Sequence, residues 1–250
     1  MSSSTVSKKS YGVDVASYQA ITVNYTGAKF AFVKLTESTN YVNPKAEAQI
    51  KSAKAHGLMV MGYFYANHSA SVSKAKAEAK YAVSKAKAYG IPAGSYLADD
   101  WEQGSGNSVN GGTSANTDAV IAAMQVIKEA GYKPLIYSGA YNFRNHLSVA
   151  RLVKSFGSCL WVASYKVSGR QDYADFGYFP SMDGVAIWQF TDNYRGLGVD
   201  GNICVVDLKV SSHSSTDKPT NKPAESLSQH PVVKWNIGAV AVVANSKGAY

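Results

Sequence analysis

The sequence predicts an α/β fold: an irregular (β/α) barrel of about eight strands with the last helices reduced to loops. From residue 11 to about residue 210, short apolar stretches alternate with helical segments, which is typical of parallel β/α architecture. After Trp161 the helical period is lost. The chain has 250 residues, of which 46% are hydrophobic and 17% charged, so it can bury one full-sized core.

The strands are expected where apolar residues run together between turn residues. The expected strands are residues 11–15, 30–35, 59–65, 95–99, 133–138, 160–164, 185–190 and 205–208. Three helices between the earlier strands are well delimited. One begins at Asn43-Pro44 and stops at Gly57, the second covers 71–89, and the third runs from about 116 to 130. Residues 165–184 and 191–202 show no helical period and are expected to be loops.

Composition divides the chain into four parts. Residues 1–10 are expected to be an N-terminal tail, and residues 11–210 the barrel. Residues 211–230 are rich in Ser, Thr, Pro and Lys, which indicates a linker. Residues 231–250 turn apolar again but are too few to close a core, so they form either a strand pair on the barrel or the start of a second module.

The net charge of +8 favours a polyanionic partner, which could be nucleic acid, a membrane surface or a wall rich in phosphate and carboxylate. Many of the lysines fall on predicted exposed helix faces, and none forms a dense basic run interleaved with aromatic residues, so we expect no nucleic-acid partner. No apolar run reaches the roughly 20 residues of a membrane span, so we expect no membrane insertion.

Neither metal nor cofactor is expected. Cys159 and Cys204 lie far apart in apolar stretches, which is typical of small buried hydrophobic residues. The histidines show no metal-binding spacing, and surface or capping roles are expected for all of them. They are His56, His68, His146, His213 and His230.

Acidic residues gather where the predicted strands end. Asp14 lies in the first strand, Asp100 and Glu102 follow the fourth, and Asp200 precedes the last. In a parallel barrel the carboxyl ends of the strands carry the reactive groups, so these acids are candidate catalytic residues. Asp207 is a competing assignment for the last position.

The Asp-x-Glu spacing is the most informative of these features. Side chains alternate across a strand, so Asp100 and Glu102 share one face while Asp99 and Trp101 point toward the helical layer. Two carboxylates in one enclosed cleft cannot both ionise freely, so one pKa rises and that group can act as an acid near neutral pH. Hydrolysis of a glycosidic bond needs such a pair.

Aromatic residues also fall at strand ends, where a lined groove would suit sugar rings. They are Tyr63, Tyr65, Trp101, Tyr137, Tyr141, Trp161, Tyr165 and Trp188. Ordinary packing explains about half of them, and Trp161 in particular is expected to be a core residue.

Several ordered segments agree with a known family. They are 11–19 (YGVDVASYQ), 32–39 (FVKLTEST), 62–65 (GYFY), 100–102 (DWE), 130–134 (AGYKP), 178–184 (YFPSMDG) and 188–189 (WQ). With these, the chain from about 11 to 208 resembles the family 25 glycoside hydrolases, the muramidase domains of many phage lysins and bacterial wall enzymes. An aliphatic residue is common in relatives at the position of Asp99.

The resemblance implies hydrolysis of the β-1,4 bond between N-acetylmuramic acid and N-acetylglucosamine in peptidoglycan. It implies that Glu102 is the general acid/base, that Asp100 stabilises the reacting sugar, and that Asp14 and Asp200 flank them. The substrate's own N-acetyl oxygen would attack the anomeric carbon, with retention. The implied substrate contacts are Lys34, Glu37, Tyr63, Tyr65, Tyr137 and Gln189.

The resemblance also implies bacterial peptidoglycan as partner and a C-terminal cell-wall-binding module beginning at 231–250. Residues 1–10 lack the apolar segment of a secretory signal, so we expect synthesis in the cytoplasm and action on the wall after holin-dependent release or lysis. Two alternatives stay open. One is a chitinase-like N-acetylglucosaminidase, although Ala98 interrupts the longer run of alternating Asp usual there. The other is a non-catalytic wall-binding lectin.

Overall fold

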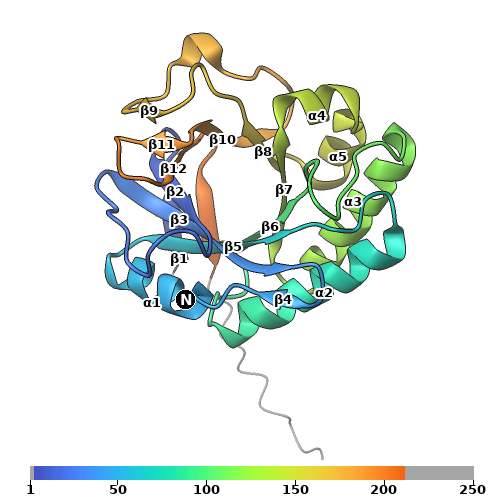
Figure 1. Ribbon diagram of the computed structural model, residues 1–250, viewed down its shortest axis with the longest axis horizontal. Coiled ribbons are helices and arrows are strands. Elements are labelled where there is room, and N and C mark those ends of the chain that lie inside the picture. Colours follow the sequence, from blue (N-terminus) through green and yellow to red (C-terminus); the bar gives the residue numbers. More distant parts are fainter. Residues whose placement is uncertain (1–2, 212–250) are drawn as a thin grey trace, which may run out of the picture. The chain divides into compact units, whose positions relative to one another are not determined.

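A closed sheet of eight strands forms the centre of the fold (Figure 1). The structure is a computed structural model and describes residues 3–211. Around the sheet the order is β2 (Tyr11–Val15), β12 (Asp200–Cys204), β10 (Val185–Thr191), β8 (Leu160–Ala163), β7 (Lys133–Gly139), β6 (Tyr96–Asp100), β5 (Met59–Tyr65) and β3 (Ala28–Glu37). Pairing of β3 with β2 closes the ring, and the predicted irregular barrel is confirmed.

The last barrel strand differs from the prediction in position and direction. Residues 205–208 were expected to form it, but β12 occupies Asp200–Cys204 and runs antiparallel to both of its neighbours, β10 and β2. The reason is the short connection over residues 192–199. A parallel crossover needs roughly a dozen residues or more, whereas an antiparallel return needs only a few. Asp200 therefore begins a strand and does not lie in a loop.

Part of the predicted N-terminal tail forms a strand instead. β1 (Ser3–Val6) pairs antiparallel with β13 (Leu208–Ser211) in a small separate sheet. Leu208 is fully buried and Val210 nearly so, which gives this pair an apolar anchor against the barrel. The expected linker beyond Ser211 and the expected module at 231–250 lie outside the described residues.

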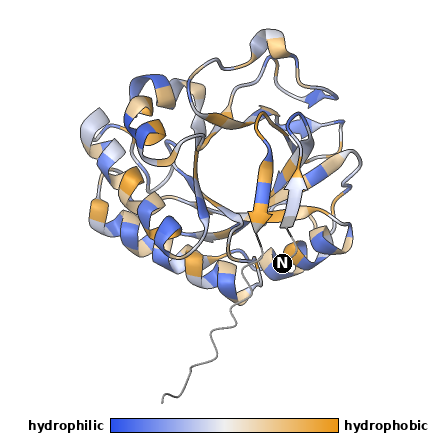
Figure 2. Ribbon diagram, turned by 180° about the vertical axis from the view of Figure 1, so that it is seen from behind, coloured by the Kyte–Doolittle hydropathy of each residue, from blue (hydrophilic) through white to orange (hydrophobic). Residues whose placement is uncertain are grey.

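Helices cover the first half of the ring and loops cover the second. The three predicted helices are α1 (Ala46–Ala55), α2 (Val72–Ala88) and α3 (Thr113–Glu129), and two short helices follow β7, namely α4 (Ala140–Asn145) and α5 (Val149–Phe156). Blue and orange alternate along these helices in Figure 2, as expected for helices with one apolar face. After β8, the described chain has no α-helix. Besides β10, β12 and β13 it contains the short strands β9 (Arg170–Gln171) and β11 (Asn193–Tyr194), which pair with each other, and the 3-10 helix η1 (Phe176–Tyr178). β4 (Tyr41–Val42) extends the sheet beside β3.

The inside of the barrel is a packed aromatic core beneath the site. Phe32 stacks on Trp161 with ring centroids 4.2 Å apart, and Phe30 meets Phe32 edge to face. Gly12 is required here, because a Cβ atom at this position would lie 2.2 Å from the Phe30 ring. This filled interior closes the barrel from below, so a ligand can enter only at the carboxyl ends of the parallel strands.

Candidate active site

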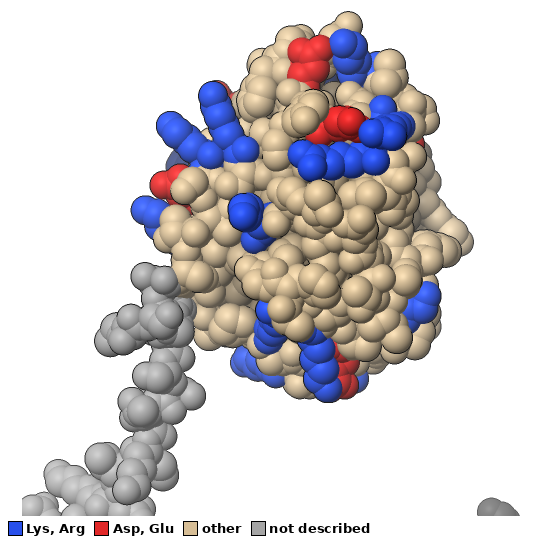
Figure 3. Space-filling view, turned by 90° about the vertical axis from the view of Figure 1, so that its left-hand side faces the viewer, with Lys and Arg blue, Asp and Glu red and all other residues tan. Residues whose placement is uncertain are grey.

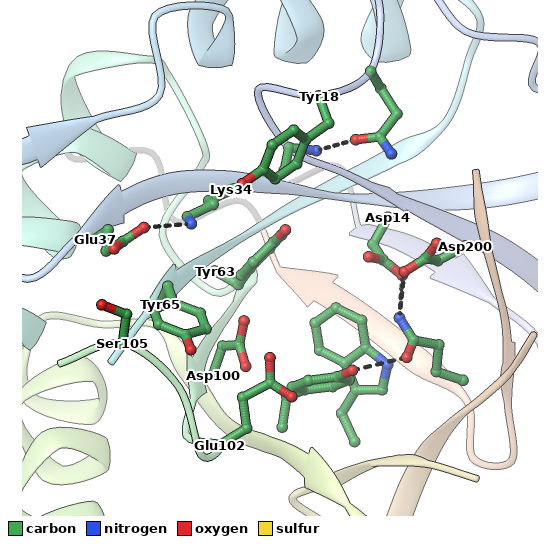
Figure 4. Close-up of a pocket in the computed structure, with 15 residues that line it drawn as sticks. Asp14, Tyr18, Lys34, Glu37, Tyr63, Tyr65, Asp100, Glu102, Ser105 and Asp200 are labelled. Atoms are coloured by element: carbon green, nitrogen blue, oxygen red, sulfur yellow. Dashed lines mark hydrogen bonds and ion pairs between the residues drawn. The ribbon is translucent and has the colours of Figure 1, made fainter. Parts of the chain in front are cut away.

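A pocket of about 400 Å³ opens at the carboxyl ends of the parallel strands (Figure 4). Its volume lies within the usual range of small-molecule sites. The lining residues are Asp14, Ala16, Tyr18, Gln19, Lys34, Glu37, Tyr63, Tyr65, Asp100, Glu102, Ser105, Tyr137, Trp161, Gln189 and Asp200. All four acids and all six substrate contacts named from the sequence are in this list. Residues from all eight barrel strands or their following loops are thus gathered at one place.

Asp100 and Glu102 reach the pocket from the end of β6. Asp100 is the last residue of the strand and is 6% exposed, whereas Glu102 lies just beyond it and is half-buried. Atom Oδ1 of Asp100 is buried and has no hydrogen-bond partner among the described residues. An unpaired buried acceptor is costly, so this oxygen is suited to a donor that arrives with a ligand.

Asp14 and Asp200 meet on the other side of the pocket. The antiparallel pairing of β2 with β12 places them directly opposite each other. Gln189 Nε2 donates to Asp14 Oδ2 at 2.9 Å and to Asp200 Oδ2 at 3.2 Å, and Asn202 Nδ2 donates to Asp14 Oδ2 at 2.8 Å. Asp207, the competing candidate, is exposed and accepts a hydrogen bond from the backbone N–H of Lys8. It does not line the pocket.

Burial raises the pKa of all four carboxyl groups. The pKa of Asp100 lies well above its ordinary value because of burial and, next, the charge of Glu102. Burial and then the charge of Asp14 raise the pKa of Glu102, while Lys34 opposes both shifts. Burial and Asp14 raise the pKa of Asp200 to about 8. Burial also raises the pKa of Asp14, against the hydrogen bonds from Asn202 and Gln189. Some of these groups therefore carry protons at neutral pH.

Lys34 is the cation of the pocket wall. Its Nζ lies 2.8 Å from Glu37 Oε2 and 4.8 Å from the ring centre of Tyr65. The pKa of Tyr63 is raised well above its usual range by burial and by the surrounding carboxylates, so its phenol stays protonated and can donate. Tyr137 already donates its hydroxyl to Gln189 Oε1 at 2.8 Å.

Asp99 and Trp101 point away from the pocket, as alternation predicts. Asp99 is fully buried and lies 3.1 Å from Nε2 of His68, which is also fully buried. The sequence interpretation of His68 as a surface or capping residue was therefore wrong. Its partner lies thirty-one positions away in the chain, so no local pattern could reveal it. The acidic partner raises the pKa of His68 against the opposing effect of burial, which favours a buried ion pair.

Sequence reasoning missed several pocket residues. Tyr18, Gln19 and Ser105 lie in loops, where the chain shows no period, although Tyr18 and Gln19 follow the Asp14 strand closely and could have been found from that position. Trp161 was expected to be a core residue; it is 1% exposed and stacks in the barrel, yet it also forms part of the pocket floor. Tyr165 donates its hydroxyl to Gln189 Oε1 at 2.6 Å and supports the site from behind.

Other site types find little support within residues 3–211. No group of three or more His, Cys, Asp and Glu residues there is arranged to hold a metal ion. Cys159 and Cys204 are both free and buried, as predicted. No described helix is long and apolar enough to cross a membrane.

Clustered acids with raised pKa values, in a tyrosine-lined pocket at the open end of a barrel, define a glycoside hydrolase. The chain belongs to the glycosyl hydrolases family 25, whose model matches residues 13–199. The resemblance seen in the sequence and the predicted enzyme class, a hydrolase of the lysozyme type, are thereby confirmed.

Phage lysozymes are among its relatives. The chain is 42% identical over 179 residues to the lysozyme of Lactococcus phage mv1, covering 70% of this chain and 89% of that protein. It is 32% identical over 207 residues to the lysozyme of Streptococcus phage Cp-7, covering 81% of this chain and 55% of the relative. The chain thus spans about half the length of the Streptococcus phage relatives.

Solved structures of endolysins resemble the fold of this chain. The multimodular pneumococcal cell wall endolysin from phage Cp-1, solved with choline, has a TM-score of 0.68 at 29% identity, covering 86% of this chain and 58% of that one. The modular Cpl-1 endolysin in complex with a peptidoglycan analogue has a TM-score of 0.67 at 29% identity, covering 81% of this chain and 56% of that one.

Proposed function

We propose that the chain hydrolyses the β-1,4 bond between N-acetylmuramic acid and N-acetylglucosamine in peptidoglycan and thereby lyses bacterial cell walls. The observation that carries the proposal is the convergence of Asp14, Asp100, Glu102 and Asp200 on one tyrosine-lined pocket. Relatives named as lysozymes and a similar endolysin solved with a peptidoglycan analogue support the choice of substrate.

Glu102 is the general acid in this proposal. It is the more accessible carboxyl group of the Asp-x-Glu pair, and burial together with the charge of Asp14 raises its pKa, which favours the protonated form that a general acid needs. Glu102 gives that proton to the glycosidic oxygen as the bond breaks. In the second half of the reaction its carboxylate takes a proton from the attacking water.

Asp100 orients the substrate's N-acetyl group. Its unpartnered Oδ1 can accept the amide N–H, which turns the amide oxygen toward the anomeric carbon. That oxygen forms the new bond while the leaving oxygen receives the proton of Glu102. Water then opens the cyclic intermediate, so the configuration at the anomeric carbon is retained without a bond to the enzyme.

Asp14 and Asp200 are the flanking carboxyl groups beside the reacting sugar, and the ionised ones among the four acids supply negative charge there. Positive charge develops on the sugar ring as the bond breaks, and fixed carboxylates nearby lower the energy of that state. Lys34, Glu37, Tyr63, Tyr65 and Tyr137 line the space where the sugars would lie.

The hydrogen bonds of Gln189 support a role other than the substrate contact expected for it. Its Nε2 donates to Asp14 and Asp200, and its Oε1 accepts from Tyr137 and Tyr165. An amide has two donors and an acceptor oxygen with two lone pairs, so these four bonds use its full capacity. We therefore assign Gln189 to holding the two carboxylates in place.

The anionic wall is the partner in this proposal, and the enzyme acts on it after release from the cell where it is made. Neither nucleic acid nor membrane insertion has a part in it. The net charge of +8 suits a surface rich in carboxylate and phosphate groups.

Digestion of purified peptidoglycan, followed by mass spectrometry of the released fragments, tests the proposal. Fragments with N-acetylmuramic acid at the new reducing end are expected, and chitin should remain uncut. Glu102→Gln serves as the inactive control. Reducing ends carrying N-acetylglucosamine, cleavage of chitin at a similar rate, or binding without cleavage would contradict the proposed function.

A further inference from the structure

Tyr18 stands out among the exposed aromatic residues because it lines the pocket. Its side chain is 90% exposed, the highest value among the exposed large hydrophobic residues of the described chain. Tyr173, which is 67% exposed, packs edge-on to Tyr11 and lies under the guanidinium of Arg195. Within residues 3–211 the Tyr18 ring makes no such aromatic or cation contact. Its faces are therefore open to a ligand.

The loop that carries Tyr18 is held firmly in spite of this exposure. Lys45 Nζ donates to the backbone carbonyls of Ser17 at 2.7 Å and of Gln19 at 2.8 Å, on either side of Tyr18. Gln49 Nε2 donates to the carbonyls of Ala16 at 2.8 Å and Ala20 at 3.2 Å. Four side-chain bonds thus fix the loop backbone to α1 and to its N-cap residue Lys45.

A buried network links this clamp to the pocket wall. Gln49 is fully buried, and its Oε1 accepts a 3.0 Å hydrogen bond from Nδ2 of the buried Asn43. The same nitrogen donates to the backbone carbonyl of Lys34 at 2.9 Å. Buried amide groups are retained only when their hydrogen bonds are satisfied, and here those bonds hold the Tyr18 loop at a set position beside Lys34.

A fixed backbone that displays a free aromatic ring is suited to binding. A ring on a loop that is already ordered loses little conformational freedom when a ligand stacks on it. A sugar ring offers a flat face of C–H groups that can lie against a tyrosine. In Figure 4, Tyr63 and Asp100 lie between Tyr18 and Glu102, so the ring is set apart from the group that donates the proton.

We propose that Tyr18 is a stacking platform for a sugar ring of the glycan strand at the mouth of the pocket, and that Lys45 and Gln49 hold it ready. This inference rests on the proposed function, because it takes the ligand to be a glycan. Tyr18 contributes to affinity and to substrate choice and takes no part in bond cleavage.

Binding of peptide-free peptidoglycan fragments of two disaccharide repeats tests the inference by calorimetry, in a Glu102→Gln background so that the fragment stays intact. Tyr18→Ala should weaken binding about fivefold to tenfold, as expected for loss of one aromatic stack. Tyr18→Phe and Tyr18→Trp should stay within about twofold of the parent, because the stack needs the ring and not the hydroxyl. Tyr173→Ala is the matched control and should bind like the parent.

Kinetics with Glu102 intact separate binding from chemistry. Tyr18→Ala should raise KM by a similar factor and leave kcat unchanged, since the ring acts equally on ground and transition states. Lys45→Met should weaken binding less than Tyr18→Ala and should add nothing in the Tyr18→Ala background. Additive effects of the two substitutions would show that the clamp does not act through Tyr18.

The inference is overturned if Tyr18→Ala binds like the parent, or if Tyr18→Phe loses as much affinity as Tyr18→Ala. In both cases the parent enzyme would still bind and cut the glycan, and the proposed function would stand. If the parent neither binds nor cuts peptidoglycan fragments, the proposed function fails, and the inference fails with it.

Discussion

Gln189 Nε2 lies 2.9 Å from Oδ2 of Asp14, although the two residues are 175 positions apart in the chain. The same amide reaches Asp200, while two tyrosine hydroxyls bind its oxygen. The hydroxyls can only donate to the amide oxygen here, so they orient the amide with its N–H groups toward the carboxylates. One neutral side chain thereby sets the positions of two of the four acids.

Replacing Gln189 should therefore damage catalysis more than binding. Gln189→Leu removes the donors to two buried carboxyl groups, and we expect kcat to fall by about 10 to 100-fold with a small change in KM. Loss of the hydrogen bond also raises the pKa of Asp14, so the acid limb of the rate profile should move to higher pH. Tyr165→Phe, which removes one bond to the amide oxygen, should have a milder effect. The pH profile of kcat on soluble fragments measures this, and a rise in KM at unchanged kcat would restore Gln189 as a substrate contact.

Glu102→Gln should fold normally and lose about 10² to 10⁴ in rate, because the amide keeps the shape of the side chain but has no proton to give. Asp100→Asn should also be severely impaired, since an amide in its place can present a donor to the substrate N–H. Turbidity loss of wall suspensions measures both, with circular dichroism as the check on folding. A glycosyl adduct trapped on Asp100 would contradict the substrate-assisted route, and near-normal turnover of Glu102→Gln would end its assignment.

The acid cluster should make the protein less stable as the pH rises. The folded pKa of Asp200 is about 8, against an ordinary value of 3.8, so the folded chain binds this proton more tightly than the unfolded chain. By linkage, stability falls between about pH 4 and pH 8. Asp200→Asn removes the charge, and we expect Tm at pH 8 to rise by about 2–8 °C, with the gain lost near pH 4. Asp207→Asn, at an exposed position, is the control. A gain that is equal at both pH values would show that the buried charge is not its cause.

Two deletions test the limits of the folded unit. Removal of 212–250 should leave Tm within about 2 °C, because residues 3–211 contain the closed sheet and the β1–β13 pair. Removal of 207–250 also takes away β13 and its buried side chains Leu208 and Val210, and it leaves β1 unpaired. We expect that deletion to lower Tm by about 5–15 °C. Similar melting temperatures for the two deletions would mean that the terminal pair does not stabilise the barrel.

Activity on intact walls should fall with added salt more steeply than activity on short uncharged fragments. The charge of +8 is spread over the surface, and on the face in Figure 3 Lys and Arg occur in several separate groups. Exposed charges are screened over about 8–10 Å at physiological ionic strength, whereas contacts inside the pocket are shielded. Rates on both substrates from low to moderate salt measure the difference. Parallel losses would show that the basic surface does not recruit the enzyme to the wall.

The sequence by itself determined the barrel and the position of its acids. The patterns that predict the barrel are local, because each reflects backbone preferences that act over a few residues. They are the alternation of strands and helices, the glycines at which helices end, and the loss of the helical period after Trp161. The Asp-x-Glu spacing is local too, because side chains alternate along β6 and the extended residues just after it, which puts Asp100 and Glu102 on one side. The family resemblance added roles that no local pattern could supply.

Only the tertiary structure decided how distant segments pair. The direction of β12, the β1–β13 pair, the buried His68–Asp99 contact and the four bonds of Gln189 all join residues far apart in the chain. In the sequence, Tyr18 has the features of an ordinary exposed loop residue. Only the structure shows that Lys45 and Gln49 hold the backbone around it. Such contacts depend on which chain ends and faces the closed sheet brings together. Burial and the hydrogen bonds that buried polar groups require decide which segments pair. These long-range pairings produce no periodic pattern in the sequence.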